Sequence, residues 1–279
     1  MLKTLASPSG RTFRLGRKRP LALPPRMLRM ASYIRRTFPA PPPTCDWTPK
    51  AMASVEEVYL NDVESDCVIA CGAHWEGLWT GNATGTPIIY NNSQINQQYS
   101  AIGGYVPGDP STDNGCDEVS ALQYWQHYGF AGGTPIATFM LVNSSDPVEV
   151  RIAINEFGGV MYGAELAQAW AQNMPDKNGF TWNVAGAPDP SLGHCFLGGG
   201  FKPGFVKIIE WGLWGWISDA ATAEYASSDQ GGGLYTAVTE DWIIKASKES
   251  PSGFAFADLM SDLHNLGWAT GQKQSQAYA

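Results

Sequence analysis

Two residue types, far apart in the chain, could together make and break a covalent bond. Cys67 follows Asp66 at the predicted start of a helix, and His194 follows Gly193 at the start of an apolar run. Asp66 is a plausible N-cap, and the unpaired N–H groups and dipole at a helix N-terminus stabilise a thiolate. A thiolate is the competent nucleophile, and a histidine can form it by taking the proton of the thiol. The two residues therefore predict a Cys-His dyad.

Other residues could take these roles. Cys71 lies one turn beyond Cys67 on the same helix face, and it would become the nucleophile if the helix began later. We expect it to be a core residue, because it lacks the terminal N–H groups. His74 shares the helix face of Cys67 and is also expected in the core, and two further histidines lie near predicted helix ends. The alternative to a dyad is a buried structural thiol and a structural histidine.

The motifs around the dyad resemble a family. The chain is similar to a bacterial and phage branch of the papain-like cysteine peptidase superfamily, in which Asn-Asp precedes the catalytic cysteine by four intervening residues. The resemblance covers residues 45–267 and rests on the order and spacing of six segments: Asn61-Asp62, Asp66-Cys67-Val68-Ile69-Ala70, Asp109-Pro110-Ser111-Thr112-Asp113-Asn114-Gly115, Gly193-His194, Trp211-Gly212 and Asp241-Trp242.

The resemblance implies a papain-like α+β fold, in which a helical half carrying the nucleophile helix packs on an antiparallel β half. It implies that Cys67 is the nucleophile, that His194 is the general base, and that Asn61 donates to the oxyanion together with backbone N–H groups. The implied substrate is a peptide or protein, and no cofactor is implied.

One position departs from the family pattern. Papain-like enzymes carry an asparagine two residues before the tryptophan of Trp-Gly, and its amide oxygen orients the histidine. This chain has Ile209 there, which accepts no hydrogen bond. Glu210 is adjacent but is expected on the opposite side of the strand. The sequence therefore predicts an imidazole without an orienting group and weak catalysis.

A metal site is the less favoured interpretation of the same residues. Cys67, Cys71 and His74 form a C-x3-C-x2-H pattern, and His194 could be a fourth ligand. This spacing is not that of common structural zinc sites. No metal is expected.

The N-terminal segment is strongly basic. Residues 1–45 carry ten Lys or Arg and no acid, so the remainder holds 18 − 10 = 8 basic and all 26 acidic residues. We expect three parts: a basic, proline-rich arm (residues 1–44), a papain-like domain (45–270) and a C-terminal tail (271–279). The arm either folds back on the acidic domain or docks to an acidic partner, a nucleic acid or another assembly surface.

The hydrophobic pattern predicts helices before strands, which is typical of an α+β protein. Helices are expected in or around residues 26–37, 67–80, 117–128, 147–157 and 255–266. Strands are expected at residues 159–165, 194–199, 205–211 and 234–238, and residues 167–192 are expected to form a long loop.

Two functions follow from these observations. The first is a thiol hydrolase of peptide or isopeptide bonds. The second is a weakly active or inactive papain-like scaffold that serves as a structural or binding subunit of a phage particle or membrane complex, anchored by its arm. Five cysteines without a disulfide pattern, and no continuous apolar signal segment or transmembrane stretch, predict a cytoplasmic or virion-associated protein.

Overall fold

The structure is a computed structural model that describes residues 4–23, 27–34, 38–253, 255, 257–258 and 261. Most of the predicted helix at 255–266 and all of the tail at 271–279 lie outside the described residues. Among the described helices, none has the length and apolar character needed to cross a bilayer.

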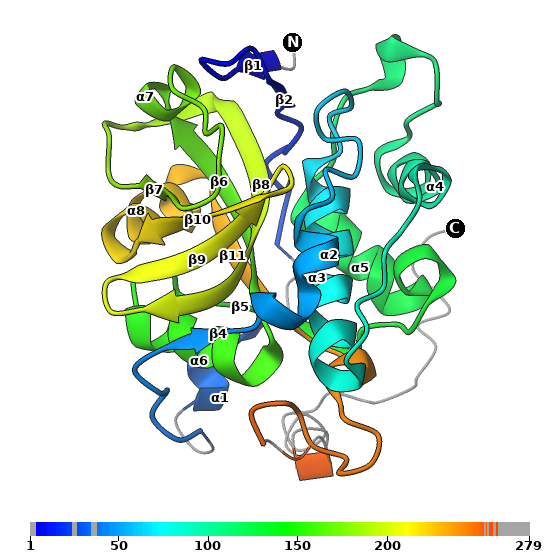
Figure 1. Ribbon diagram of the computed structural model, residues 1–279, viewed down its shortest axis with the longest axis vertical. Helices are drawn as coiled ribbons and strands as arrows, with labels where there is room; N and C mark the ends of the chain where they lie inside the picture. Colours follow the sequence, from blue (N-terminus) through cyan, green and yellow to red (C-terminus); the bar gives the residue numbers. More distant parts are fainter. Residues whose placement is uncertain are drawn as a thin grey trace.

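The chain forms a helical half and a sheet half that lie side by side (Figure 1). The sheet has the strand order β3-β5-β11-β6-β8-β9-β10-β7, and β4 (Cys45–Asp46) pairs with β8 off this path. The helical half contains α2 (Met52–Val55), α3 (Cys67–Thr84), α4 (Asn92–Gly103) and α5 (Glu118–Tyr128). The main strands of the sheet half are β5 (Thr138–Leu141), β6 (Val160–Ala167), β8 (Pro188–Lys202), β9 (Phe205–Glu210), β10 (Leu213–Ser218) and β11 (Gly233–Val238).

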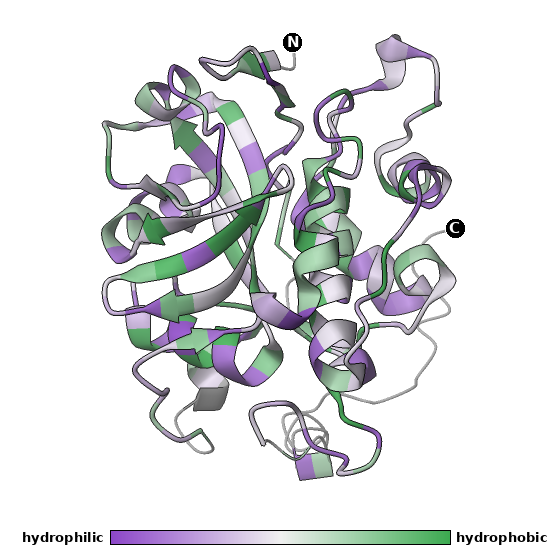
Figure 2. Cartoon of the chain, in the orientation of Figure 1, coloured by the Kyte–Doolittle hydropathy of each residue, from purple (hydrophilic) through white to green (hydrophobic). Residues whose placement is uncertain are grey.

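Helix α3 is the central element between the halves. It begins at Cys67, as predicted, and ends where Gly85 adopts a left-handed conformation with φ 84°. Nearly all of its residues are buried, as expected for a helix that is covered on every side. Figure 2 shows the resulting apolar character of α3 and of the strands that face it. The fold therefore fixes Cys67 at the junction of the two halves.

The helices predicted at residues 117–128 and 147–157 are confirmed as α5 and α6 (Pro147–Phe157). Each begins after an aspartate whose side chain caps the helix. Asp117 accepts from the Ser120 N–H at the start of α5. Asp146 accepts from the first-turn N–H groups of α6. The predicted strands at 159–165, 205–211 and 234–238 agree with β6, β9 and β11 to within two residues, and the one at 194–199 lies inside the longer β8.

The prediction of a long loop at 167–192 is wrong. This segment contains α7 (Gln168–Ala171), β7 (Phe180–Trp182) and the start of β8. Its turn-forming residues lie between two buried tryptophans, Trp170 and Trp182, whose rings stack at 4.6 Å. These aromatic anchors hold the segment against the sheet half.

The arm folds back on the domain. It forms a hairpin of β1 (Thr4–Ala6) and β2 (Thr12–Arg14), then β3 (Leu28–Arg29) and α1 (Met30–Ile34), and β3 pairs parallel with β5. Phe13 and Leu15 are buried in the core of the sheet half. Between β2 and β3 the arm runs along the boundary between the halves, beside α3 and β8 (Figure 1). We call this boundary the seam.

Candidate active site

Cys67 lies at the seam and is buried, with 1% of its surface exposed. Burial raises the pKa of its thiol well above the usual value, the charges of Cys116 and Glu210 raise it further, and the backbone of Cys195 and Gly16 acts in the opposite direction. Burial therefore favours the protonated thiol here and opposes the thiolate that a helix N-terminus stabilises.

Asp66 occupies the N-cap position of α3, but its side chain makes no capping hydrogen bond. The expectation that it caps the helix is therefore wrong. Both of its carboxyl oxygens are buried and have no hydrogen-bond partner among the described residues. Burial and the charge of Glu64 raise the pKa of Asp66 well above its ordinary value. A neutral carboxyl thus lies directly beside the candidate nucleophile.

Replacing Asp66 with asparagine is expected to stabilise the fold at neutral pH. A carboxyl whose pKa is raised in the folded state binds a proton that the unfolded chain has lost, so stability falls as pH rises between the two pKa values. Asp66→Asn removes this dependence, and each pKa unit of the shift is worth about 1.4 kcal/mol. Urea unfolding at pH 5 and pH 8 measures the effect. Equal pH dependence in the variant and the parent would contradict it.

His194 lies on β8 and is fully buried. Its Nε2 lies 2.9 Å from Oε2 of Glu210, a close polar contact whose direction is not that of a straight hydrogen bond. The ring stacks on Trp211 with centroids 4.3 Å apart. Burial raises the pKa of Glu210, and the charge of His194 opposes that shift. A carboxylate and an indole thus hold the imidazole from two sides.

The expectation that His194 lacks an orienting group is wrong, and strand register gives the reason. Leu197 on β8 is opposite Ile209 on β9. Because side chains alternate along a strand, Ile209 shares the face of Leu197 and Glu210 shares the face of His194. Ile209 is accordingly fully buried in the core beneath α3.

Trp211 and Gly212 form a two-residue turn between β9 and β10, where Glu210 pairs with Leu213. Both residues have positive φ, 49° for Trp211 and 72° for Gly212, as a type I′ turn requires. A bulky residue in this conformation costs about 1–3 kcal/mol. In this strained turn, the Trp211 indole stacks on the His194 ring.

Cys67 and His194 are not joined by a hydrogen bond in this structure. Nδ1 of His194 has no hydrogen-bond partner within the described part of the chain. Glu210 lies near both groups, since its charge acts on the pKa of Cys67 and it contacts His194. The fold therefore brings the predicted residues to the same region, where the arm backbone bonds to Gly193, the residue before His194.

Asn61, the predicted oxyanion donor, binds the arm. Its Nδ2 donates to the carbonyl oxygen of Glu64 at 3.2 Å and to that of Arg14 at 3.4 Å. The Arg14 N–H in turn donates to the Asn61 carbonyl at 3.0 Å. An arm carbonyl thus takes the amide that was expected to serve a substrate carbonyl.

The arm backbone crosses the seam beside Cys67. Cys116 donates to the Gly16 carbonyl at 3.1 Å, and Lys18 donates to the Cys116 carbonyl at 2.9 Å. These bonds make Arg17 the partner of Cys116 in a parallel bridge. On the other side, Arg17 N–H donates to the Gly193 carbonyl at 3.3 Å. The arm therefore joins both walls of the seam by main-chain bonds.

Glycines allow this close approach. A Cβ on Gly16 would collide with the Ser65 carbonyl, and one on Gly115 would collide with the Gly16 carbonyl. A Cβ on Gly193 would lie 2.5 Å from the Arg17 carbonyl oxygen. Backbone thus packs directly on backbone at the crossing. The glycine before His194, read from the sequence only as part of a motif, makes room for the arm.

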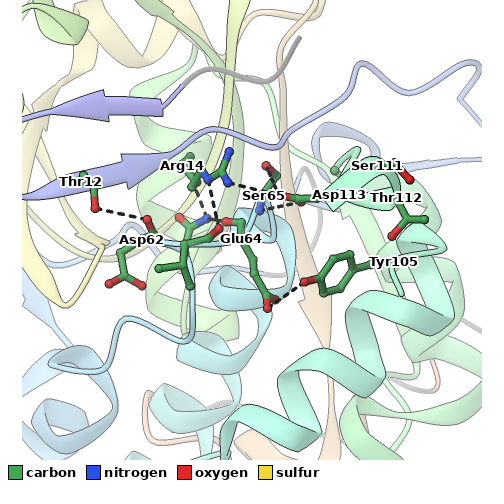
Figure 3. A network of polar contacts seen from close by, with 12 residues as sticks. Thr12, Arg14, Asp62, Glu64, Ser65, Tyr105, Ser111, Thr112 and Asp113 are labelled. Carbon is green, nitrogen blue, oxygen red and sulfur yellow. Dashed lines mark hydrogen bonds and ion pairs between the residues drawn. The ribbon is translucent and has the colours of Figure 1, made fainter. Parts of the chain in front are cut away.

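Polar side chains hold the arm to the helical half further along (Figure 3). Nε of Arg14 donates to the Val63 carbonyl at 3.1 Å, and its guanidinium lies 3.9 Å from Asp113. Asp113 also accepts from the Ser65 N–H at 2.9 Å. The arm and the loop that leads into α3 are therefore connected through shared acceptors.

The alternative residues lie in the core. Cys71 is buried beside Cys195. His74 is buried, its Nδ1 lies 2.9 Å from the Ser54 carbonyl, and burial lowers its pKa to about 4. All five cysteines are free thiols. Within the part of the chain that the structure describes, no group of three or more Cys, His, Asp or Glu side chains is arranged to hold a metal ion.

Neither protein-family models nor the sequences of curated proteins match the chain. Solved structures do match it. Xylellain, a cysteine protease from Xylella fastidiosa, aligns with TM-score 0.58 and 14% identity over 86% of this chain and 99% of its own.

Two further structures are similar. The ragweed pollen cysteine protease Amb a 11, in its proform, aligns with TM-score 0.53 and 13% identity over 74% of this chain and 69% of its own. Procathepsin B S9 from Trypanosoma congolense aligns with the same TM-score and identity over 81% and 86%. The strand order, the central helix and these alignments together show that the chain has the α+β fold of the papain-like cysteine proteases.

Proposed function

We propose that the chain is a latent thiol hydrolase of peptide or isopeptide bonds, held inactive by its own arm. The observation that carries this proposal is the path of the arm, whose backbone bonds to Cys116 and Gly193 on either side of Cys67. A peptide bonded to these walls would present its carbonyls near the thiol. The 2.9 Å contact between Nε2 of His194 and Oε2 of Glu210 supports a working base.

The reaction follows from these residues. When the arm leaves, water reaches Cys67 and the cost of ionising its thiol falls. His194 takes the thiol proton, and the sulfur adds to the substrate carbonyl carbon. The oxyanion accepts from the Asn61 amide and from the Cys67 N–H. His194 then protonates the leaving amine as the C–N bond breaks, and water hydrolyses the thioester that remains.

Glu210 has the orienting role in this scheme. Its carboxylate holds the Nε2 side of the ring and stabilises the imidazolium that forms, which leaves Nδ1 to face the thiol. Trp211 stacks on the face of the same imidazole ring. Two of the similar structures are proforms by name, and a latent state of this chain agrees with that.

Substituting Gly16 with alanine tests the proposal in the full chain. The added Cβ collides with the Ser65 carbonyl and is expected to push the arm off Cys67. We expect alkylation of Cys67 by iodoacetamide to become at least about 10-fold faster, since about 1.4 kcal/mol of lost arm binding has that effect. Peptide mapping by mass spectrometry identifies the labelled cysteine.

Gly10→Ala is the matched control, because it lies in the same arm and a Cβ there meets nothing within 4 Å. Its φ of 86° adds strain at the hairpin turn only. Equal labelling of Cys67 in Gly16→Ala, Gly10→Ala and the parent chain would contradict the latent state.

The second candidate is an inactive scaffold that acts as a structural or binding subunit. The observation in its favour is the buried, protonated thiol of Cys67 without a hydrogen bond from His194. If Cys67 is labelled at the same rate in Gly16→Ala with and without His194→Ala, the scaffold is favoured, because the base then has no effect on the thiol.

A further inference from the structure

We propose that the space now filled by the Arg17 side chain is a specificity site that takes an arginine or lysine side chain of a peptide substrate. This inference rests on the proposed function and adds the class of substrate. We call the space the Arg17 site, and it is formed by Glu118, Glu165 and Gly163.

The site is fully buried and acidic. Nε of Arg17 lies 2.6 Å from Oε1 of Glu118, and Nη1 lies 4.0 Å from Oε1 of Glu165. The side chains of Arg17 and Glu118 have no exposed surface, and that of Glu165 has 2%. Arg19, which also pairs with Glu165, is half exposed and lies at the edge. The cation inside the site is therefore supplied by Arg17.

The site is shaped for a side chain that enters from the seam. Glu118 begins α5, and the N-terminus of that helix favours a negative charge. Gly163 on β6 faces Glu118, and a Cβ there would collide with Oε1 of Glu118 and lie 2.9 Å from Nε of Arg17. A glycine at this strand position thus leaves room for the guanidinium.

The backbone bonds of Arg17 place it as a substrate residue would be placed. The flanking Gly16 carbonyl and Lys18 N–H bond to Cys116, and its own N–H bonds to Gly193, the residue before His194. A substrate strand that makes the same main-chain bonds therefore directs one side chain toward Glu118. The arm shows which chemistry that position accepts.

An uncharged side chain there would leave the buried carboxyl of Glu118 without a cation. Burial already raises the pKa of Glu118, and the Arg17 charge and hydrogen bond oppose that shift. Nη1 and Nη2 of Arg17 and Oε2 of Glu118 have no hydrogen-bond partner among the described residues. Oε2 of Glu118 is therefore an acceptor that the arm's own arginine leaves unused.

The test uses the full chain carrying Arg17→Ala, which vacates the site. Fluorogenic peptides that differ in one residue, Arg, Lys or Gln, are compared at each position by kcat/KM. We expect one position at which Arg or Lys exceeds Gln by about 100-fold, the size seen when one partner of a buried charge pair is removed. Adding Glu118→Gln is expected to abolish that preference.

Glu224→Gln on α8 (Asp219–Tyr225) makes the same change outside the site and is expected to keep the preference. Gly163→Ala is a second variant that blocks the site while retaining both carboxylates. Hydrolysis of the Arg and Gln peptides at equal rates would overturn the inference and leave the proposed function standing.

A binding measurement distinguishes a failure of the specificity site from a failure of the proposed hydrolase activity. Calorimetry on the chain with Cys67→Ala and Arg17→Ala measures the affinity for the same peptides without catalysis. Selective binding of the Arg or Lys peptide, lost in Glu118→Gln, supports the site even if no peptide is hydrolysed. Equal affinity for all three peptides overturns it.

Discussion

Arg17→Ala is expected to expose Cys67 and to give the largest gain in thiol reactivity of any single arm substitution. Breaking a buried ion pair by removing one partner costs about 3–5 kcal/mol, because the remaining charge has no compensation. The loss falls on the bound arm, since Arg17 connects it to Glu118 and Glu165. We expect Cys67 alkylation to accelerate by about 100-fold or more, as 3 kcal/mol corresponds to that factor.

The control for this prediction is Arg151→Ala, which removes a pair of the same length outside the seam. Arg151 lies 2.6 Å from Asp219, and both side chains are partly exposed. Near-UV circular dichroism reports whether either variant has lost its tertiary packing. If Arg17→Ala does not fold, Arg17→Lys, which keeps a positive charge, is used in its place. Unchanged labelling in a folded Arg17→Ala chain would contradict the role of the arm.

Glu210→Ala is expected to cause the largest loss of activity among residues that do not react with the substrate. Without the carboxylate 2.9 Å from Nε2, the His194 imidazole loses its orientation and the charge that stabilises its protonated form. We expect kcat to fall by about 10²–10⁴ in the Arg17→Ala background while KM changes little, in line with removal of the acidic triad member in serine proteases.

Ile209→Val is the matched control at the neighbouring position. Ile209 is fully buried and faces away from His194, so the change is expected to cost about 0.5–1.5 kcal/mol of stability and to leave kcat unchanged. If Ile209→Val lowers kcat as much as Glu210→Ala does, Glu210 has no special role in orienting the base.

The elements that carry the site could be predicted from local patterns. Helix α3 begins at Cys67, and β8 contains His194, because helix starts and apolar strand runs are local features of the chain. The role of Glu210 could not be predicted. It depends on the pairing of Leu197 with Ile209, which is a contact between strands and is not written in either strand alone.

The arm shows the same limit. Its positive charge left open whether it folds back on the acidic domain or docks to another surface, and charge alone does not select which carboxylates it meets. The place where the arm crosses the seam is set by Gly16, Gly115 and Gly193. Without side chains, these residues allow the arm backbone to pack on the backbone of both halves. The state of Cys67 could not be predicted either. A thiol at a helix N-terminus is expected to ionise, but burial raises the pKa of the Cys67 thiol.

The most direct test of the latent state is to cut the arm and measure the reactivity of Cys67. A protease recognition sequence placed at residues 20–23, where Leu21 is fully exposed, allows the arm to be severed in the folded chain. Loss of the arm peptide is confirmed by mass spectrometry, and iodoacetamide labelling of Cys67 is timed before and after the cut. We predict labelling that accelerates by about 100-fold or more after the cut, as loss of a buried ion pair implies, and that slows again when His194→Ala is added. Labelling that stays at the uncut rate after the arm peptide has left would contradict the account.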